Sequence, residues 1–280
     1  MNAIYMLMHQ RKPNVVSIAQ RVLEACNQAG LAISTEPWLV EMLDEECRSK
    51  LATTVTPDSC DGILAVGGDG TILRANNLAV QVGVPLLGVN IGRVGFLTEV
   101  ELEQVETAMQ FLKEGRFEIE ERMMLEARVD EHVRLALNDV VVSRGGYTRL
   151  MGVDAFVNGD PLGRFLGDGL IVSSPTGSTG YSLSAGGPIV FPHLDCMLIT
   201  PICAHALQLR PVVTAADQMI TIKVVGDLPA VVGVDGQKPL LFSENQTLTV
   251  TRSDKRARFI RFAQHSFFNM IRIKLAEWSC

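Results

Sequence analysis

Long hydrophobic runs, paired cysteines and an excess of basic charge are all missing from this 280-residue sequence. Each apolar stretch is interrupted within about a dozen residues by a charged residue, His or Pro, whereas a membrane-spanning helix needs about 20 apolar residues in succession. With 25 Lys and Arg against 31 Asp and Glu, the formal net charge is −6, which argues against a general nucleic-acid binder. We expect neither a membrane nor a nucleic acid as a partner.

The six cysteines include no Cys-x-x-Cys pair, which is typical of reduced thiols in a cytoplasmic protein rather than of disulfides. The five histidines show no metal-ligand spacing, so no protein-bound metal site is predicted. The apolar segment 1–8 lacks a preceding basic region and a small-residue cleavage site, and it therefore predicts a first strand rather than a signal peptide. The expected location is cytoplasmic.

The first half of the chain alternates apolar runs with segments of helical periodicity, which predicts an α/β fold around a doubly wound parallel sheet. Strands are expected at 3–8, 62–66 and 85–89, and helices at 13–30, 72–82 and 101–113.

From about residue 117 the pattern changes to short apolar or alternating runs, which are typical of β-strands. Such runs cover 118–129, 135–143, 155–157, 170–173, 197–200, 220–225 and 248–251. Asn158-Gly159 and Asp235-Gly236 predict hairpin turns, because these residues tolerate a positive φ. The predicted organisation is an α/β domain over 1–116, a β-rich, sandwich-like domain over 117–256, and a segment over 257–280, with a helix at 267–275, that packs back on the first domain.

A glycine-rich loop, Gly67-Gly68-Asp69-Gly70-Thr71, stands between a predicted strand and a predicted helix. Its glycines let the backbone approach a ligand, and its N–H groups together with the helix N-terminus attract phosphate, so Asp69 is a candidate base beside a phosphate. The alternative is a tight strand-to-helix turn with Asp69 as the N-cap. No Gly-x-Gly-x-x-Gly spacing and no Gly-Lys pair occurs, which excludes a dinucleotide fingerprint and a Walker loop.

Two further motifs carry polar groups suited to a nucleotide. The stretch 167–188 leads from an apolar strand into a loop rich in hydroxyls and glycines that ends near Tyr181, and these groups suit phosphate oxygens, ribose hydroxyls and a stacked ring. Asn138-Asp139 interrupts an apolar run, where an amide and a carboxylate could bind an adenine edge and ribose hydroxyls. The alternatives are a Ser/Thr/Gly-rich connection for the first motif and a strand-end turn for the second.

Together these motifs resemble those of the bacterial NAD kinases. The resemblance extends through Thr200-Pro201-Ile202-Cys203-Ala204-His205 and Val234-Asp235-Gly236-Gln237, in matching order and spacing from about residue 60 to 240. It implies a Rossmann-like α/β domain followed by a β-rich domain that binds NAD. It also implies phosphoryl transfer from ATP, or another nucleoside triphosphate or polyphosphate, to the 2′-hydroxyl of the adenosine ribose of NAD. A divalent cation, Mg²⁺, is expected with the phosphoryl donor, and a homodimer or homotetramer is the expected assembly.

The resemblance also implies roles for individual residues. Asp69 matches the proton acceptor for the ribose hydroxyl. The implied NAD contacts are Asp69 itself, Gly70, Arg74, Asn138, Asp139, Arg149, Leu166, Asp168, Thr179, Gly180, Tyr181, Ser182, Leu183, Ser184 and Gln237. Leu166 falls where several members have a polar contact residue, Gly180 replaces a common Ala, and Asp139 stands where Glu is frequent.

Two other functions compete with this interpretation. A lipid or sugar kinase can share the glycine loop, although it gives no reason for Asn138-Asp139 or for the loop at Tyr181. A non-catalytic dinucleotide sensor would keep the binding pocket without turnover, and the retained Asp69 argues against it.

Overall fold

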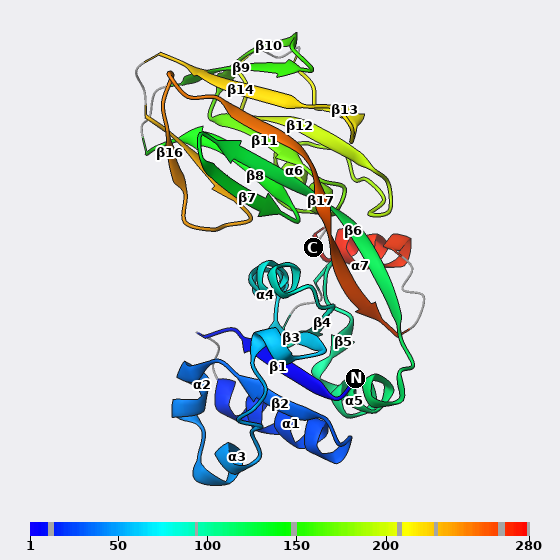
Figure 1. Ribbon diagram of the computed structural model, residues 1–280. Helices are drawn as coiled ribbons and strands as arrows, with labels where there is room; N and C mark the ends of the chain where they lie inside the picture. The colour runs from blue at the N-terminus through cyan, green and yellow to red at the C-terminus, as the bar shows by residue number, and fades with distance from the viewer. Residues whose placement is uncertain are drawn as a thin grey trace. The chain divides into compact units, whose positions relative to one another are not determined.

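The computed structural model describes residues 1–10, 14–92, 95–146, 150–205, 209–226, 229–262 and 267–278. The chain divides into two compact units, which are described separately below. Unit 1 comprises Met1–Glu121 with Ala257–Cys280, and unit 2 comprises Arg122–Arg256. The chain passes from one unit to the other within two strands, β6 and β17 (Figure 1). The domain boundaries expected after residues 116 and 256 stay a prediction.

Unit 1 is built on a parallel sheet. Its strands are β1 (Ala3–Met8), β2 (Ala32–Thr35), β3 (Gly62–Gly67), β4 (Leu86–Asn90), the short β5 (Val100–Glu101) and the end of β17 (Leu248–Arg261). They run in the order β2-β1-β3-β4, with β5 and Phe259 of β17 also pairing with β4. Every residue of β3 and β4 is buried, as expected for parallel strands covered on both faces.

The helices of unit 1 are α1 (Val15–Gln28), α2 (Pro37–Met42), α3 (Glu45–Ser49), α4 (Asp69–Val82), α5 (Val105–Glu114) and α7 (Phe267–Trp278), with 3-10 turns η1 (Pro57–Ser59) and η2 (Leu102–Gln104). Helices α1 to α5 pack on the parallel sheet, and several of their ends follow from the sequence. Gly30, Gly83 and Gly115 end α1, α4 and α5 with φ of 71°, 78° and 72°, a left-handed conformation that favours glycine. None of the helices in the described ranges is long and apolar enough to cross a membrane.

An ion cluster is buried in unit 1 beside the end of β17. Arg261 pairs with Glu99 at 2.9 Å and also with Glu120, and the Glu99 side chain is only 1% exposed. We expect Arg261→Met to lower the free energy of unfolding by about 2–3 kcal/mol, because it removes the guanidinium that pairs with the carboxylates of Glu99 and Glu120. Urea unfolding checks this value. The control is Arg258→Met at an exposed position of the same strand, where a loss as large as that of Arg261→Met would contradict the explanation.

Unit 2 consists of two antiparallel sheets. One contains β6 (Glu118–Val129), β7 (His132–Ala136), β9 (Met151–Val157), β10 (Asp160–Gly167), β14 (Ile220–Val225) and β17. The other has the order β13-β12-β11-β8-β15-β16. Its strands are β8 (Asp139–Arg144), β11 (Gly169–Ser173), β12 (Cys196–Ile202), β13 (Val212–Ala215), β15 (Ala230–Val234) and β16 (Leu240–Phe242), and η3 (Thr176–Thr179) and α6 (Tyr181–Ser184) follow β11.

The core of unit 2 lies between its two sheets. Val140 and Val142 of β8 share one buried cluster with Val153 of β9 and Ile222 of β14. Alternate residues of a strand point to opposite faces, so each sheet contributes one apolar face to this core. The predicted β-rich, sandwich-like fold is confirmed, as is the α/β fold with parallel strands in unit 1.

The structure refines several predicted elements. The run 135–143 is two strands, β7 and β8, separated by Leu137 and Asn138, whereas the run at 248–251 is only the beginning of the long strand β17, which continues to Arg261. Both predicted turns are confirmed, with φ of 50° at Asn158 and 47° at Asp235. The edge strands β10, β13 and β16 were not expected, because their sequences carry little periodicity.

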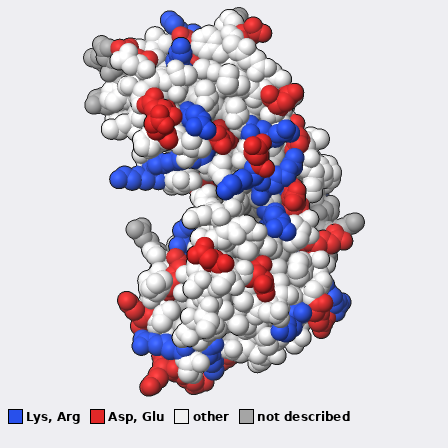
Figure 2. Space-filling model, in the orientation of Figure 1, with Lys and Arg blue, Asp and Glu red and all other residues white. Residues whose placement is uncertain are grey.

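The surface mixes charges of both signs. On the face drawn in Figure 2, Lys and Arg side chains lie next to Asp and Glu side chains on each unit. Asp195, for example, pairs with both Arg252 and Arg256. The five cysteines in the described residues are free, and Cys26, Cys47 and Cys60 are buried, as expected of reduced thiols.

Candidate functional site

In unit 1 the candidate residues lie at the carboxyl edge of the parallel sheet. Gly67 ends β3 level with Asn90 of β4, and Gly68 is the N-cap of α4. Ligands of open α/β sheets bind outside this edge. A methyl group placed at Gly68 or Gly70 would meet no atom within 4 Å, whereas one at Gly67 would lie 2.3 Å from Thr71 Oγ1. The loop is therefore packed on its inner side and open on its outer side.

Asp69 is the first residue of α4, and its carboxylate is held by backbone groups. The N–H of Phe96 donates to Oδ2 at 3.1 Å, and the N–H of Leu97 donates to Oδ1 at 3.2 Å. Each oxygen keeps a lone pair for a further partner. Asp69 is thus a fixed, half-buried acceptor beside the open glycines, and the contribution of segment 95–97 was not foreseen from the sequence.

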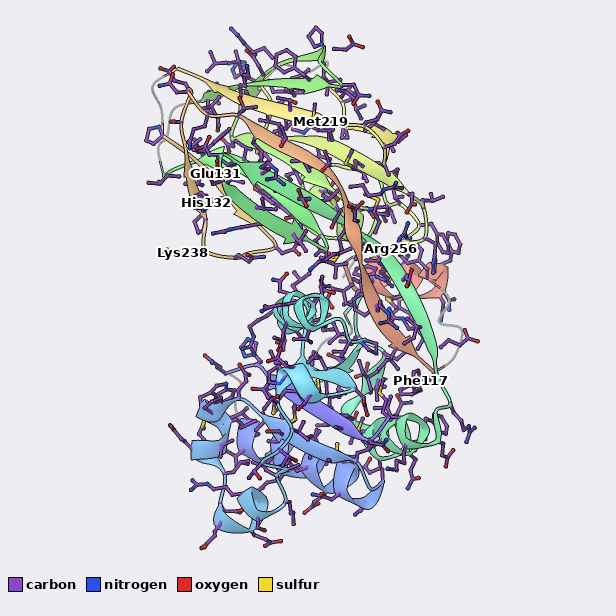
Figure 3. All side chains as sticks on the ribbon, viewed as in Figure 1. Phe117, Glu131, His132, Met219, Lys238 and Arg256 are labelled. Carbon is purple, nitrogen blue, oxygen red and sulfur yellow. The ribbon has the colours of Figure 1, made fainter. Side chains whose placement is uncertain are left out.

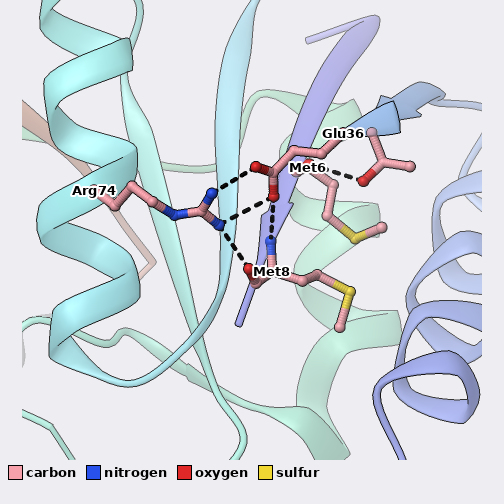
Figure 4. Close-up of polar contacts among 5 residues, drawn as sticks. Met6, Met8, Glu36 and Arg74 are labelled. Carbon is pink, nitrogen blue, oxygen red and sulfur yellow. Dashed lines mark hydrogen bonds and ion pairs between the residues drawn. The ribbon is translucent and has the colours of Figure 1, made fainter. Parts of the chain in front are cut away.

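Arg74 lies one turn further along α4, and Glu36 holds it (Figure 4). The guanidinium donates to both oxygens of Glu36 and to the carbonyl oxygen of Met8 at 2.6 Å, and the Met8 N–H donates to Glu36 at 3.4 Å. The Arg74 side chain is 42% exposed and that of Glu36 15% exposed. Glu36 therefore fixes Arg74 against the end of β1, a role that no local sequence pattern indicated.

In unit 2 the Asn138-Asp139 motif begins β8 and is held by Asp235. The Asp235 carboxylate accepts the N–H groups of Leu137, Asn138 and Asp139 at 2.6, 2.9 and 3.0 Å. The Asp235 N–H in turn donates to the carbonyl oxygen of Asp139 at 3.1 Å. Asp235 belongs to the predicted hairpin turn, but its contact with this motif was not predicted.

Burial makes ionisation costly for both carboxyl groups of this cluster. Burial, followed by the charge of Asp235, raises the pKa of Asp139 from 3.8 to about 7. Burial also raises the pKa of Asp235, but the N–H groups that it accepts oppose that rise. Because Asp235 has these donors, we assign the shared negative charge to Asp235 and the proton to Asp139.

The loop after β11 approaches this cluster closely. A methyl group at Gly177 would lie 2.2 Å from the backbone oxygen of Asn138, and one at Gly180 would lie 3.5 Å from Asn138 Nδ2 and 3.7 Å from Asp139 Oδ2. Glycine at position 177 lets the loop lie against the Asn138 backbone, and Gly180 lies beside the side chains of Asn138 and Asp139. The loop in 167–188 and the Asn138-Asp139 motif therefore lie close enough to contact one ligand, as predicted from the sequence.

Several hydroxyls of the loop bond within the protein. The Ser174 and Thr179 hydroxyls donate to the carbonyl oxygens of Leu137 and Thr176. Ser182 bonds to Thr200 at 2.9 Å, and Ser178 bonds to the backbone of Val190. Tyr181 and Ser184 remain exposed, and Leu183 is half-buried. Many of the hydroxyls expected to face a ligand therefore shape the loop instead.

Two buried polar atoms in this region have no hydrogen-bond partner in the protein. They are Asn138 Oδ1 and Thr176 Oγ1. A buried acceptor without a donor costs about 1–3 kcal/mol, so such an atom indicates a missing ligand or water.

The remaining predicted contacts lie at the other end of β8 and β11. Asp168 precedes β11 and pairs with Arg144, the last residue of β8, at 3.3 Å. The carbonyl oxygen of Leu166 accepts the N–H of His205, and the Leu166 side chain is 49% exposed. Gly169 pairs with Ser143 and Ser173 with Asp139, so these residues are separated from Asn138-Asp139 by the length of β8. Arg149 lies outside the described residues.

The structure thus brings Asn138, Asp139, Gly180 and Asp235 together, and Gln237 follows in the same turn, where its N–H donates to Val234. A separate hollow of about 380 Å³ lies by the turn between β6 and β7. Glu131 and His132 mark this turn in Figure 3 and line the hollow together with Leu241. None of the predicted site residues lines it.

The chain is similar to proteins of one family along most of its length. Residues 4–117 match the family model described as the ATP-NAD kinase N-terminal domain, and residues 137–262 match the ATP-NAD kinase C-terminal domain. It is 44% identical over 224 residues to a protein of Moorella thermoacetica named NAD kinase, covering 78% of this chain and 72% of that protein. It is 39% identical to the NAD kinase of Heliobacterium modesticaldum over 287 aligned positions, covering 99% of each.

Two solved structures share its fold. An NAD kinase from Archaeoglobus fulgidus in complex with ATP superposes with a TM-score of 0.75 at 28% identity, covering 99% of both chains. Yeast NADH kinase complexed with NADH gives a TM-score of 0.80 at 24% identity, covering 95% of this chain and 84% of the other.

Proposed function

Because the chain belongs to the NAD kinase family, we propose that the two groups of residues described above phosphorylate NAD with Asp69 as the general base. The reaction is NAD kinase chemistry, in which a phosphoryl group passes from ATP to a ribose hydroxyl of NAD. Both domains match NAD kinase family models, and these matches give no support to the alternative of a lipid or sugar kinase.

The observation that carries the proposal is the held carboxylate of Asp69 beside an open glycine loop. A general base must lie within hydrogen-bond reach of the proton that it removes. Phe96 and Leu97 each occupy one position on the carboxylate and leave further lone pairs, and the absence of side chains at Gly68 and Gly70 leaves room for a ribose. In this proposal Asp69 takes the proton of the adenosine ribose 2′-hydroxyl as the hydroxyl oxygen attacks the γ-phosphorus of ATP. The bond from that phosphorus to the β,γ-bridging oxygen breaks, and ADP leaves with the bond's electron pair.

In this proposal several positive groups stabilise the negative charge of the ATP and NAD phosphates. The N-terminus of α4 and the loop N–H groups favour anions. Arg74 is proposed to contact the dinucleotide with the guanidinium N–H groups that Glu36 and Met8 leave available. The divalent cation, Mg²⁺, is treated as part of the ATP substrate, since Mg²⁺ is usually bound through substrate phosphates. Among the described residues no cluster of three or more His, Cys, Asp or Glu side chains is arranged to hold a metal.

Unit 2 is proposed to bind the adenosine part of NAD. The buried Asn138 Oδ1 has no partner in the protein, and an adenine amino group is a suitable donor for it. Asp139 is proposed to bind ribose hydroxyls, and the exposed Tyr181 to stack on a ring. The other proposed contacts at this end are Thr179, Gly180, Ser182, Leu183, Ser184 and Gln237.

Leu166, Asp168 and Arg149 are proposed as further contacts, and the first two lie at the opposite end of β8. A homodimer or homotetramer remains our proposal for the assembly, and sedimentation velocity measures it directly. The free cysteines and the use of ATP and NAD support a cytoplasmic location.

The test is an assay of NADP formation from NAD, ATP and Mg²⁺, read out with an NADP-specific dehydrogenase. We expect steady NADP formation that requires all three components, and parallel reactions with polyphosphate or NADH define the range of donors and acceptors. Folded protein that is stabilised by NAD in a thermal shift assay but forms no NADP with any donor would instead support the dinucleotide sensor.

A further inference from the structure

Residues 95–97, which hold Asp69, lie in the loop between β4 and β5, and the side chain of Asn90 contacts both Gly92 and Glu101. This side chain is 1% exposed. Its Oδ1 accepts the Gly92 N–H at 3.1 Å, and its Nδ2 donates to the Glu101 carboxylate at 2.8 Å. One buried amide therefore connects the beginning of the loop to β5, where the loop ends.

The second half of this loop is packed against β4 and α4. The Glu99 N–H donates to the carbonyl oxygen of Gly88 at 2.9 Å. A methyl group at Gly88 would lie 2.6 Å from Ile72 Cδ1 and 3.2 Å from Thr98 Cα, so helix, strand and loop are in close contact there. Leu97 and Thr98 are both buried. The backbone that reaches Asp69 therefore has little freedom to shift.

Gly95 lies directly against the Asp69 carboxylate. A methyl group at Gly95 would lie 2.1 Å from Oδ1 and 2.9 Å from Cγ of Asp69, distances that real side chains do not adopt. Gly95 is not among the glycines with positive φ, so its backbone conformation does not require glycine. Glycine is required at position 95 only because a side chain there has no room beside Asp69.

We propose that Gly95 is a positioning residue, which fixes the direction of the Asp69 carboxylate by leaving no gap and no side chain between them. The bare Cα of Gly95 limits the carboxylate on one side, while the Phe96 and Leu97 N–H groups fix its two oxygens. The remaining lone pairs then point away from the loop, toward the open side of Gly68 and Gly70. This inference rests on the proposed role of Asp69 as the base.

The first test compares Gly95→Ala with wild type in the NADP assay. A base displaced by about 1 Å loses proton transfer but not substrate binding, so we expect kcat to fall by about 10- to 100-fold while KM for NAD changes less than about 3-fold. The matched control is Gly233→Ala, because a methyl group there would meet no atom within 4 Å and Gly233 has no positive φ. Its kcat should remain within about 2-fold of wild type.

The second test is independent of activity. Asp69→Ala removes the atoms that the new methyl group would meet. Gly95→Ala should therefore lower the Tm by about 5 °C in the wild-type background and by less than about 1 °C in the Asp69→Ala background. If Gly95→Ala alone fails to fold, recovery of a folded protein on adding Asp69→Ala supports the same contact.

Equal Tm losses in the two backgrounds would overturn the proposal, as would an unchanged kcat for Gly95→Ala when Asp69→Asn is inactive. A different result, full activity of Asp69→Asn, would remove the base role of Asp69 and with it the proposed positioning function, even if the Tm comparison still reported the contact. The two failures are thus distinguishable.

Discussion

Asp69→Asn is expected to lower kcat for NADP formation by about 10³-fold while NAD still binds, because general base catalysis contributes about 10²–10⁴-fold and an amide cannot accept the proton. The substitution keeps the shape of the side chain. Its amide oxygen can still accept one N–H of segment 96–97, but its NH₂ group then faces the other donor. We therefore expect a modest loss of stability in addition to the loss of turnover.

Rates at saturating NAD and ATP, together with the shift in Tm on adding NAD, separate turnover from binding. Asp58→Asn is the matched control, since Asp58 is exposed in η1 of the same unit, and it should retain wild-type kcat and Tm. A kcat for Asp69→Asn within 3-fold of wild type would show that another group accepts the proton.

Asp139→Asn should stabilise the nucleotide-free protein above pH 7 and have little effect near pH 4. The pKa of Asp139 is about 7 in the folded protein against 3.8 in the unfolded chain, so the folded state binds the proton more tightly. Stability from this group is therefore complete below about pH 4 and is lost as the pH rises through 7. One pKa unit corresponds to about 1.4 kcal/mol, which sets an upper limit of about 4 kcal/mol on the gain at pH 8.

Urea unfolding of both proteins at pH 4.5 and pH 8, without nucleotide, measures this difference. Asp160→Asn, at the exposed first residue of β10, is the control, and its free energy of unfolding should match wild type at both pH values. A stabilisation of Asp139→Asn that is equal at both pH values would exclude ionisation as its cause. A destabilisation at pH 8 would show that Asp139 is charged and usefully paired there.

The parts of the site that the sequence predicts are those whose signals are local. Gly67-Gly68-Asp69-Gly70 follows a fully apolar strand and precedes a periodic helix, so three neighbouring patterns agree on one strand–loop–helix unit. Asn138-Asp139 is recognisable in the same way, since two polar residues separate β7 from the apolar part of β8.

The residues that hold this site could not be predicted, because their partners are distant in sequence. Glu36 contacts Arg74 across 38 residues, Leu97 contacts Asp69 across 28, and Asp235 contacts Leu137 across 98. A carboxylate in a turn or a glycine in a loop has many ordinary explanations, and only the fold shows what each one faces.

For the loop hydroxyls the sequence predicted more ligand contacts than the structure leaves available. A run of Ser and Thr suggests ligand contacts, but short hydroxyl side chains also satisfy nearby backbone groups. The Ser178 hydroxyl donates to the carbonyl oxygen of Val190, and the Ser182 hydroxyl bonds to the hydroxyl of Thr200. Composition alone does not separate these two uses.

Unit 1 is made of two segments that are far apart in the chain, and this has a consequence for synthesis on the ribosome. Phe259 pairs with β4, Ile260 belongs to the unit 1 core and Arg261 neutralises Glu99, yet all three are translated after the whole of unit 2. Unit 2 is continuous, so it is the first to emerge complete. The unit that carries Asp69 begins to form first and is finished last, and a nascent chain stopped before residue 257 would have an incomplete sheet, without the strand end that carries Arg261.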